Sequence, residues 1–505
     1  MLDLGTSFLA SVERDPDALA IVDGEMRLSY LQWYDKVSAL AAALRGTGLK
    51  RGDHVLTAMQ NRWENASLHW ACQFLGLVVT PLNWRAKADE IDFGIEDAGA
   101  KAVFYEASTE EAVRLSRLAQ ALPQFSAEAL ADIMRGKAPD VVPVADAADW
   151  SLMLYTSGTT SKPKGVPRRH RAERAGAVAH VAQNLYRHGE RTLGVMPLYH
   201  TMGVRSLIAS SLIGGTFVCL PRFDVAKALD LIEEEKITNL YLVPTLYHDL
   251  VHHEAFSTER VASVTKLGYA GASMTDGLLK RLDQTFRPEL FVNHYGSSEI
   301  YTFTIEQTAT AKPGSAGRAG INQTIRVVKL GSRNPDERAE VGEEGEIIAL
   351  MKSDEAFEGY WKRPDADAKA LHGGWYFTGD TGFVDRDGDL FVTGRADDMI
   401  ITGGENVSPV EVESCLSLHE GVAEVAVVGL PDERWGKIVV AFVKRRGDVT
   451  AEDLDRHCRD SGLANFRRPR RFVFVEAIPK SPVGKLLRRL LVAGEYTEER
   501  IPEHQ

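Results

Sequence analysis

The stretch Thr156-Ser157-Gly158-Thr159-Thr160-Ser161-Lys162-Pro163-Lys164-Gly165 directly follows an apolar run at residues 152–155. Such a run is typical of a buried strand. Glycine lets backbone N–H groups approach an anion closely, hydroxyls donate further hydrogen bonds, and lysine adds a mobile positive charge. The stretch therefore predicts a loop that binds phosphates at the end of a strand.

This loop differs from the P-loop of kinases and GTPases, which requires Gly, four residues, and then Gly-Lys-Ser/Thr. Counting on from Gly158 places Pro163 where the second glycine should stand. The alternative is a flexible Ser/Gly linker. Two lysines around a proline, directly after a buried strand, argue against that alternative.

The composition of the 505 residues, 44% hydrophobic and 26% charged, is that of a globular chain with two or more domains. A net charge of −12 argues against general nucleic-acid binding. No apolar run approaches the roughly 20 residues of a membrane span, and the start of the chain lacks a signal-peptide pattern. We expect a cytoplasmic protein with no nucleic-acid and no membrane partner.

The four cysteines are widely separated in the sequence and lack the CxxC spacing of a zinc or redox site. We expect Cys72, Cys219, Cys415 and Cys458 to be reduced, buried small hydrophobic residues. The acidic run at residues 385–389 has glycine at its fourth position, whereas a calcium loop needs it at the sixth, so a tight hairpin is predicted there.

Apolar strands and amphipathic helices alternate along the first hundred residues, which indicates an α/β domain with parallel strands. The predicted strands are 18–22, 54–59, 78–81 and 102–105, and the predicted helices are 29–44, 64–74 and 90–97. A looser region at 108–149 leads into the phosphate loop. Beyond the loop, a helix is predicted at 175–185, and the basic cluster 168–171 is interpreted as a solvated helix face.

Three later segments, 197–203, 270–273 and 295–299, are polar or small-residue turns at the predicted ends of strands. In α/β sheets, ligands bind at the carboxyl ends of strands, so these turns could converge on one site. A lone histidine usually has a structural role, so His200 is a candidate site residue only because it lies in such a turn.

After residue 342 the sequence pattern predicts short β segments instead of alternating strands and helices. The stretch 394–399 is interpreted as a domain boundary. Ser408-Pro409-Val410-Glu411 is a capping box that predicts the start of a helix. Strands at 422–430, 438–444 and 471–475, with a helix opened by Thr450, complete a small α+β domain. The predicted domains are residues 1–394 and 395–505.

The small domain ends in a cluster of basic and aromatic residues, which suggests a polyanionic ligand or partner, or else a solvated surface. The cluster consists of Phe466, Arg467, Arg468, Arg470, Arg471, Phe472, Lys480, Lys485, Arg488 and Arg489.

Five motifs follow one another across nearly the whole chain: 155–165, Tyr295-Gly-Ser-Ser-Glu299, Trp375-Tyr-Phe-Thr-Gly-Asp380, the run 394–406 and Pro482-Val-Gly-Lys485. In this order they resemble the adenylate-forming superfamily of acyl-CoA synthetases, luciferases and peptide-synthetase adenylation domains. The segments at 197–200, 432–436 and 466–469 are most similar to the branch of 4-chlorobenzoate:CoA ligase and other aryl-CoA ligases. The resemblance implies a large α/β domain with a distorted β-barrel subdomain, and a small mobile α+β domain.

The resemblance also implies an ATP-dependent acid:CoA ligase that uses ATP, CoA and Mg²⁺. A carboxylate attacks the α-phosphate of ATP, pyrophosphate leaves, and the CoA thiol then displaces AMP from the acyl-adenylate. AMP is a far better leaving group than oxide, so the enzyme mainly positions the reactants and stabilises phosphoryl charge.

Site residues follow from the same resemblance. The β- and γ-phosphates are assigned to Thr156, Ser157, Gly158, Thr159, Thr160 and Lys164. Glu299 is expected to hold Mg²⁺, Tyr295 to stack on adenine, and Asp380 with Arg395 to bind the ribose; Ser298 belongs to the same nucleotide site. Lys485 is expected to reach the acyl-phosphate oxygens, and Lys164, Glu299 and His200 complete the catalytic set.

In this family the small domain rotates between the two half-reactions, with the hinge expected at Asp397. Rotation would bring Gly403 and Gly404 to the pantetheine tunnel. The residues expected at the nucleotide end of CoA are Trp435, Phe466, Arg467, Arg468 and Arg471.

The acyl pocket is expected to contain His200, Met202, Gly203, Tyr247, Ala270, Gly271, Ile300 and Tyr301. The size of Tyr301 predicts a short pocket, and no aspartate in 199–204 could pair with an α-amino group, which disfavours amino acids. Ser161 departs from the glycine of many relatives. The expected partner is a small aromatic or heteroaromatic acid that is benzoate-, halobenzoate- or furoate-like, and a homodimer is left open. The alternatives are a medium-chain fatty-acyl-CoA ligase and a non-catalytic binding or carrier-docking homologue.

Overall fold

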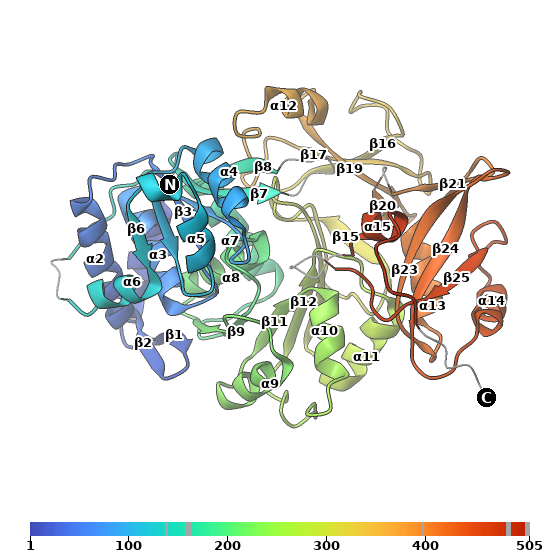
Figure 1. The fold of residues 1–505 in the computed structure, drawn as a ribbon, viewed down its shortest axis with the longest axis horizontal. Helices are drawn as coiled ribbons and strands as arrows, with labels where there is room; N and C mark the ends of the chain where they lie inside the picture. Colours follow the sequence, from blue (N-terminus) through green and yellow to red (C-terminus); the bar gives the residue numbers. More distant parts are fainter. Residues whose placement is uncertain (137–139, 157–162, 396–397, 481–485, 500–505) are drawn as a thin grey trace.

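The computed structural model describes residues 1–136, 140–156, 163–395, 398–480 and 486–499. Within them, the chain forms three β-sheets with helices packed on their faces (Figure 1). A six-stranded sheet is built from the N-terminal part, a fourteen-stranded sheet crosses the middle of the molecule, and a five-stranded sheet lies toward the C-terminus. The predicted α/β class is confirmed.

The six-stranded sheet carries the hairpin that flanks the predicted phosphate loop. Its order is β6 (Gln124–Ser126), β5 (Ala102–Tyr105), β3 (His54–Ala58), β4 (Val78–Pro81), β7 (Trp150–Thr156) and β8 (Lys164–Arg169). The strands are parallel except for the antiparallel pair of β7 and β8. The expected alternation is confirmed, because helices α3 (Trp63–Leu75) and α4 (Ala88–Ala98) connect successive parallel strands.

The large sheet has a parallel half and an antiparallel half. The parallel strands are β13 (Leu290–Tyr295), β12 (Lys266–Ala270), β11 (Asn239–Leu242), β9 (Arg191–Gly194), β10 (Thr216–Cys219) and β1 (Leu19–Asp23), with β2 (Met26–Ser29) antiparallel at the edge. The antiparallel strands are β14 (Thr304–Glu306), β15 (Ser315–Ala319), β20 (Leu390–Arg395), β19 (Trp375–Val384), β17 (Gly345–Leu350) and β16 (Ile325–Lys329), with β18 (Leu371–His372) on β19. The short β segments predicted after residue 342 correspond to β17, β18, β19 and β20 of this half.

Further helices cover these sheets and connect their strands. They are α9 (Val225–Glu234), α10 (Pro244–Val251), α11 (Asp276–Phe286) and α12 (Pro364–Ala370). In Figure 1, α9, α10 and α11 lie beside the parallel half of the large sheet.

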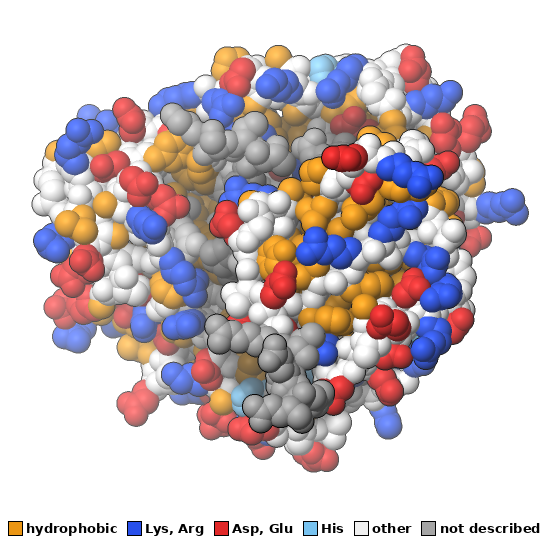
Figure 2. Space-filling view, turned by 45° about the vertical axis from the view of Figure 1, so that its right-hand side comes forward, with side chains coloured by type: hydrophobic (Ala, Val, Ile, Leu, Met, Phe, Trp, Pro, Cys, Tyr) orange, Lys and Arg blue, Asp and Glu red, His pale blue; other side chains and the backbone are white. Residues whose placement is uncertain are grey.

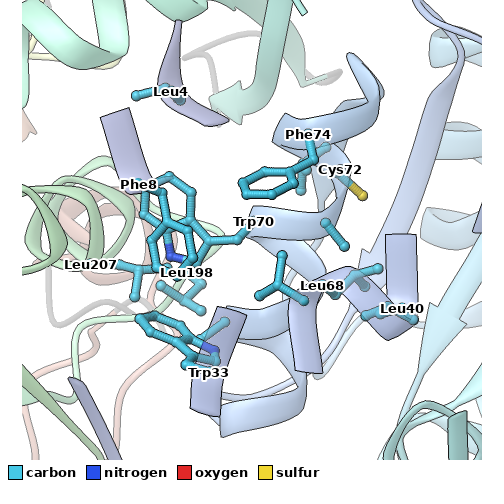
Figure 3. Close-up of a cluster of buried hydrophobic side chains, with 14 of the residues drawn as sticks. Leu4, Phe8, Trp33, Leu40, Leu68, Trp70, Cys72, Phe74, Leu198 and Leu207 are labelled. Atoms are coloured by element: carbon cyan, nitrogen blue, oxygen red, sulfur yellow. The ribbon is translucent and has the colours of Figure 1, made fainter. Parts of the chain in front are cut away.

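A buried aromatic cluster joins the helices that lie between the first two sheets (Figure 3). Helix α1 (Leu4–Arg14) places the Phe8 ring 4.7 Å from that of Trp70 and edge-on to Trp33 at 5.1 Å. Leu198 and Leu207 reach the same cluster from the N-terminal side and the body of α8 (Thr201–Leu212). The cluster therefore fixes α8, which begins at the predicted active site, against the N-terminal helices.

Helix α1 has no counterpart among the elements predicted from the sequence, although Asp3 caps it and buried residues recur along it at helical spacing. The region 108–149 is also more ordered than predicted. It contains α5 (Glu110–Leu115), the 3₁₀ turn Ala119–Ala121, β6 and α6 (Ala127–Ile133).

The interpretation of residues 168–171 as a solvated helix face is wrong. Arg168 lies at the end of β8 and is fully buried, and α7 (His170–Gln183) begins earlier than predicted. His170 is also buried, where its Nδ1 accepts a hydrogen bond of 3.2 Å from the backbone N–H of Leu4. The charges of a short basic segment do not indicate which of its side chains point into the core when the segment forms a strand.

The acidic run at 385–389 forms the predicted hairpin between β19 and β20. Its three carboxylates surround Lys312, whose Nζ lies 2.5 Å from Asp385, 2.8 Å from Asp387 and 2.6 Å from Asp389. A lysine ammonium thus occupies the position that a cation would take.

The small C-terminal sheet contains β22 (Glu405–Val407), β21 (Ile400–Thr402), β24 (Gly436–Arg445) and β23 (Val422–Asp432), with β25 (Arg471–Phe474) paired to β24. The helices of this part are α13 (Pro409–Ser417), α14 (Ala451–Asp460) and α15 (Arg488–Val492). Helix α2 (Tyr30–Gly46) belongs to the N-terminal part of the chain. Strand β20 belongs to the large sheet and β21 to the small one, while Asp397 between them lies outside the described residues. The division after residue 394 stays a prediction.

Two predicted helix starts have different outcomes. Thr450 opens α14 as predicted, and it does so with a capping box that was not predicted there. Helix α13 begins at Pro409 as predicted, but the Ser408 side chain does not cap it, because its hydroxyl donates to the Thr393 carbonyl instead. Ser408 therefore anchors α13 to β20 of the large sheet.

Candidate active site

The three predicted turns lie at the carboxyl ends of parallel strands in the large sheet. Strands β12 and β13 are direct neighbours, with Ala270 opposite His294. The Thr201 and Ser298 hydroxyl oxygens are 3.2 Å apart, which joins the start of α8 to the turn after β13. The expected convergence of these turns is confirmed.

His200 and Gly203 set the start of α8. Nδ1 of His200, at the N-cap position, accepts a hydrogen bond of 3.3 Å from the backbone N–H of Met202. A Cβ atom on Gly203 would lie 2.1 Å from the Pro197 carbonyl oxygen, so only glycine allows this turn to close.

The residues predicted for adenosine are in mutual contact. The Tyr295 hydroxyl donates a hydrogen bond of 2.7 Å to Asp380, and Arg395 forms an ion pair of 3.1 Å with the same carboxylate. Burial, with the nearby Asp380 charge, raises the pKa of Tyr295 well above its usual value, so this hydroxyl remains a donor. An aromatic face, a carboxylate and a guanidinium thus lie together, which suits a nucleoside.

Glu299 and Lys164 both contact the side chain of Tyr360. The buried Glu299 carboxylate accepts a hydrogen bond of 2.7 Å from the Tyr360 hydroxyl, and Lys164 Nζ lies 4.2 Å from the centre of the Tyr360 ring. Burial lowers the pKa of Lys164, and the Glu299 charge opposes that shift. A carboxylate beside a half-buried ammonium fits a divalent cation and a phosphate, because Mg²⁺ prefers oxygen ligands.

Tyr360 was not predicted as a site residue. It is 61 positions from Glu299, and no spacing motif links the two. The contact depends on the loop before α12 folding back over the end of β13.

Arg168 holds the backbone of the Glu299 turn from inside the protein. Its Nη1 donates hydrogen bonds to the carbonyl oxygens of Glu299 at 2.9 Å and Glu355 at 2.7 Å. Its Nε forms a fully buried ion pair of 2.7 Å with Glu173, whose other oxygen accepts from the Tyr301 hydroxyl at 2.9 Å. Arg168 therefore ties the strand that leaves the phosphate loop to the turn that carries Glu299.

The loop itself is only partly described. Thr156 and Lys164 are paired across β7 and β8, and Lys164 faces the ring of Tyr360, whose hydroxyl contacts Glu299. Ser157, Gly158, Thr159, Thr160, Lys485 and Asp397 lie outside the described residues, and their roles stay predictions.

The residues predicted for the acyl pocket occupy different environments. Met202, Ala270 and Ile300 are buried, whereas Gly271 is exposed and has φ of +85°. The Tyr247 hydroxyl donates to strand carbonyls of Leu240 and Gly268, both at 2.9 Å.

Tyr301 is fully engaged within the protein. Its ring lies 3.9 Å from the Arg168 guanidinium, and its hydroxyl donates to Glu173. The side chain is directed toward α7, where the Tyr301 ring lies 3.2 Å from the Cβ position of Gly176. The pocket assignment of these residues stays a prediction.

The residues predicted for CoA lie on the small domain, where Figure 2 shows hydrophobic side chains interspersed with Lys and Arg. The backbone N–H of Gly403 donates to the Trp435 carbonyl at 2.9 Å, and the Arg470 guanidinium lies 4.4 Å from the centre of a Trp435 ring. Gly404, like Gly403, has a positive φ.

The basic residues of this surface are largely balanced by acidic neighbours. Arg467 is paired with Glu411, and Arg468 with Asp455 at 2.9 Å, while Phe466 lies under the Arg467 guanidinium at 5.2 Å. Arg471 is exposed at the start of β25. A polyanion would therefore have to compete with existing ion pairs at Arg467 and Arg468.

Comparison with protein families shows what class of protein this arrangement belongs to. Residues 8–361 match the family described as AMP-binding enzyme, and residues 411–485 match its C-terminal domain. The chain belongs to the AMP-binding enzyme family, as the motifs predicted.

The chain aligns with curated CoA ligases over nearly their full lengths. 4-chlorobenzoate–CoA ligase of Arthrobacter sp is 35% identical over 491 residues, which is 95% of this chain and 93% of the relative. Long-chain-fatty-acid–CoA ligase FadD13 of Mycobacterium tuberculosis is 34% identical over 478 residues, covering 92% and 93%. The crystal structure of ATP-bound MatB from Rhodopseudomonas palustris has a TM-score of 0.87 at 26% identity, covering 98% of this chain and 99% of that one.

The protein is therefore an acid-thiol ligase of the AMP-forming acyl-CoA synthetase class, with ATP, CoA and Mg²⁺ as its cofactors and a carboxylic acid as its small-molecule substrate. None of the helices in the described part of the chain has the length and apolar character of a membrane span.

Replacing Arg168 by methionine should lower the free energy of unfolding by about 3–5 kcal/mol, because Glu173 would lose its guanidinium while remaining buried. Urea denaturation followed by circular dichroism would measure this loss. The control is Arg171→Met, which breaks a partly exposed pair with Glu358 and should cost about 1 kcal/mol or less. Equal losses in the two variants would contradict the role given to Arg168.

Proposed function

We propose that this enzyme converts a small aromatic or heteroaromatic carboxylic acid, benzoate-, halobenzoate- or furoate-like, into its CoA thioester through an acyl-adenylate. The observation that carries this proposal is Tyr301, a bulky side chain that is locked by Arg168 and Glu173 two residues beyond Glu299. A rigid ring there favours short, flat acids over long chains. The 35% identity to 4-chlorobenzoate–CoA ligase agrees with this choice.

A fatty acid is the second candidate. The 34% identity to FadD13, a long-chain-fatty-acid–CoA ligase, favours it about as strongly as the aryl relative favours an aromatic acid.

The proposed roles of the site residues follow from their contacts. Bound Mg²⁺ would screen the phosphate charge, and Glu299, oriented by Tyr360, is the residue proposed to hold it. Lys164 and the hydroxyls and N–H groups of 156–160 would bind the β- and γ-phosphates. Tyr295 and Ser298 would hold the adenine end of the site, and Asp380 with Arg395 the ribose hydroxyls.

The carboxylate of the acid is proposed to lie between α8 and the Glu299 turn, next to His200. Charge that develops on the phosphoryl oxygens would be stabilised by Lys485 from the small domain. Fixed donors of this kind act where charge increases in the transition state, which is why their loss lowers the rate constant more than it weakens binding.

We also propose that the small domain, residues 395–505, rotates about Asp397 between the two half-reactions. Asp398, which follows the hinge, lies 3.8 Å from Arg488, and Arg488 pairs with Glu413 at 2.7 Å. These pairs keep the start of the small domain rigid beyond the hinge. Gly403, Gly404, Trp435, Phe466, Arg467, Arg468 and Arg471 would then face CoA. We place the enzyme in the cytoplasm.

ATP–pyrophosphate exchange against benzoate, halobenzoates, furoate and C4 to C12 fatty acids would test the substrate. We expect exchange with one or more of the aromatic acids at a kcat/KM at least about tenfold above that of any fatty acid, a difference of about 1.4 kcal/mol in transition-state binding. Exchange with fatty acids alone would overturn the aryl proposal and establish the second candidate.

Replacing Lys485 by alanine should reduce adenylation by about 10²–10³-fold, since one charge-stabilising group is lost from the phosphoryl oxygens. Thioester formation from supplied acyl-adenylate should remain near the wild-type rate. Arg489→Ala, a nearby basic residue with no assigned role, is the control. Equal loss of both half-reactions in Lys485→Ala would contradict the assignment.

A further inference from the structure

Two thiols that are far apart in the sequence meet in the small domain. Cys415 lies on α13 and Cys458 on α14; the two helices contact each other, and Cys415 packs against the hydrophobic cluster that contains Cys458. The Ser461 hydroxyl links the two residues, since its Oγ lies 3.0 Å from Cys415 Sγ and donates to the Cys458 carbonyl at 2.9 Å. The expectation of free, buried cysteines is confirmed for Cys72, Cys219 and Cys458, whereas Cys415 is free but only half-buried.

The two thiols have different surroundings. Cys458 is completely buried in a hydrophobic cluster with Val412, Leu416 and Leu454, whereas Cys415 is half-buried at its edge. A small oxidant can therefore reach Cys415 first. Cys458 is then the adjacent thiol that can react with it.

The electrostatic environment agrees with this order. The hydrogen bond from Cys458 is the largest effect on Cys415 and, with Ser461 and His457, lowers the Cys415 pKa to about 6. The same contact, followed by burial, raises the pKa of Cys458. Cys415 is thus the better nucleophile, because the thiolate is the reactive form.

A metal site is a poorer explanation of the pair. Structural zinc requires four ligands, commonly cysteine and histidine. In the part of the chain that the structure describes, three or more metal-ligand side chains gather only at Asp385, Asp387 and Asp389. The neighbouring His457 directs Nε2 to the Cys415 carbonyl oxygen, 2.9 Å away, rather than to the sulfur atoms.

We propose that Cys415 and Cys458 form an oxidation site at which a peroxide produces a disulfide between α13 and α14. The Cys415 thiolate attacks one peroxide oxygen, the O–O bond breaks, and a sulfenic acid forms while water or an alcohol leaves. The Cys458 sulfur then attacks the sulfenic sulfur, releasing water. In total, two thiols lose two hydrogens and two electrons, and the peroxide is reduced.

The bond would join two helices with different neighbours. Helix α13 packs against α11 and is anchored by Ser408 to β20, both in the large body, whereas α14 lies on the outside of the small sheet. A disulfide would therefore connect the helix at the domain contact to the outer layer of the small domain.

Mass spectrometry of the native full-length protein tests the proposal. After treatment with hydrogen peroxide, the intact mass should fall by about 2 Da, and trypsin should release peptide 396–434 linked to peptide 457–459. Dithiothreitol should reverse both changes. Cys415→Ser should reduce the linked peptide by at least about tenfold, while Cys72→Ser, a fully buried cysteine outside the pair, should leave it unchanged.

A second variant fixes the order of the reaction. In Cys458→Ser, a dimedone-type reagent should trap sulfenic acid on Cys415, because no second thiol remains to remove it. The proposal is overturned if both thiols of the peroxide-treated wild-type protein still react with a maleimide after unfolding. Oxidation of Cys415 to sulfinic acid without any cross-link would overturn it equally. These measurements need no acid substrate, so they are independent of the proposed function.

Discussion

The buried guanidinium of Arg168 is the constraint on which the arrangement of the site depends. A charge in the protein interior must be paired and hydrogen-bonded, because its desolvation is otherwise too costly. Arg168 meets this requirement with the Glu173 carboxylate and with the carbonyl oxygens of Glu299 and Glu355. The strand after the phosphate loop, the first turn of α7 and the Glu299 turn are consequently held together by one side chain.

This constraint explains how segments from two sheets form one site. The hairpin of β7 and β8 belongs to the six-stranded sheet, whereas Glu299 follows a strand of the fourteen-stranded sheet. The aromatic cluster around Phe8 and Trp70 packs the helices between these sheets, and Arg168 fixes their edges where the ligands are expected. Rigid positioning of this kind suits a reaction in which the protein contributes mainly orientation and charge stabilisation.

Much of the fold and site could be predicted because the signals are local. Apolar runs predicted the strands of the first hundred residues. The family motifs assigned Tyr295 and Asp380 to the same nucleotide site, and the structure shows a hydrogen bond between them. The features that were missed depend on tertiary contacts. Arg168 looked like part of a solvated basic run, and neither the contact of Tyr360 with Glu299 nor that of Cys415 with Cys458 leaves any pattern in sequence spacing.

The central claim is that Glu299, held in place by Arg168 and Tyr360, is the carboxylate that binds Mg²⁺. The Mg²⁺ dependence of ATP–pyrophosphate exchange in Glu299→Gln tests it most directly, with the exposed Glu343→Gln as control. The account predicts that half-maximal exchange in Glu299→Gln needs at least about tenfold more Mg²⁺, because the amide retains the shape but not the charge of the ligand. A Mg²⁺ dependence equal to that of wild type would contradict it.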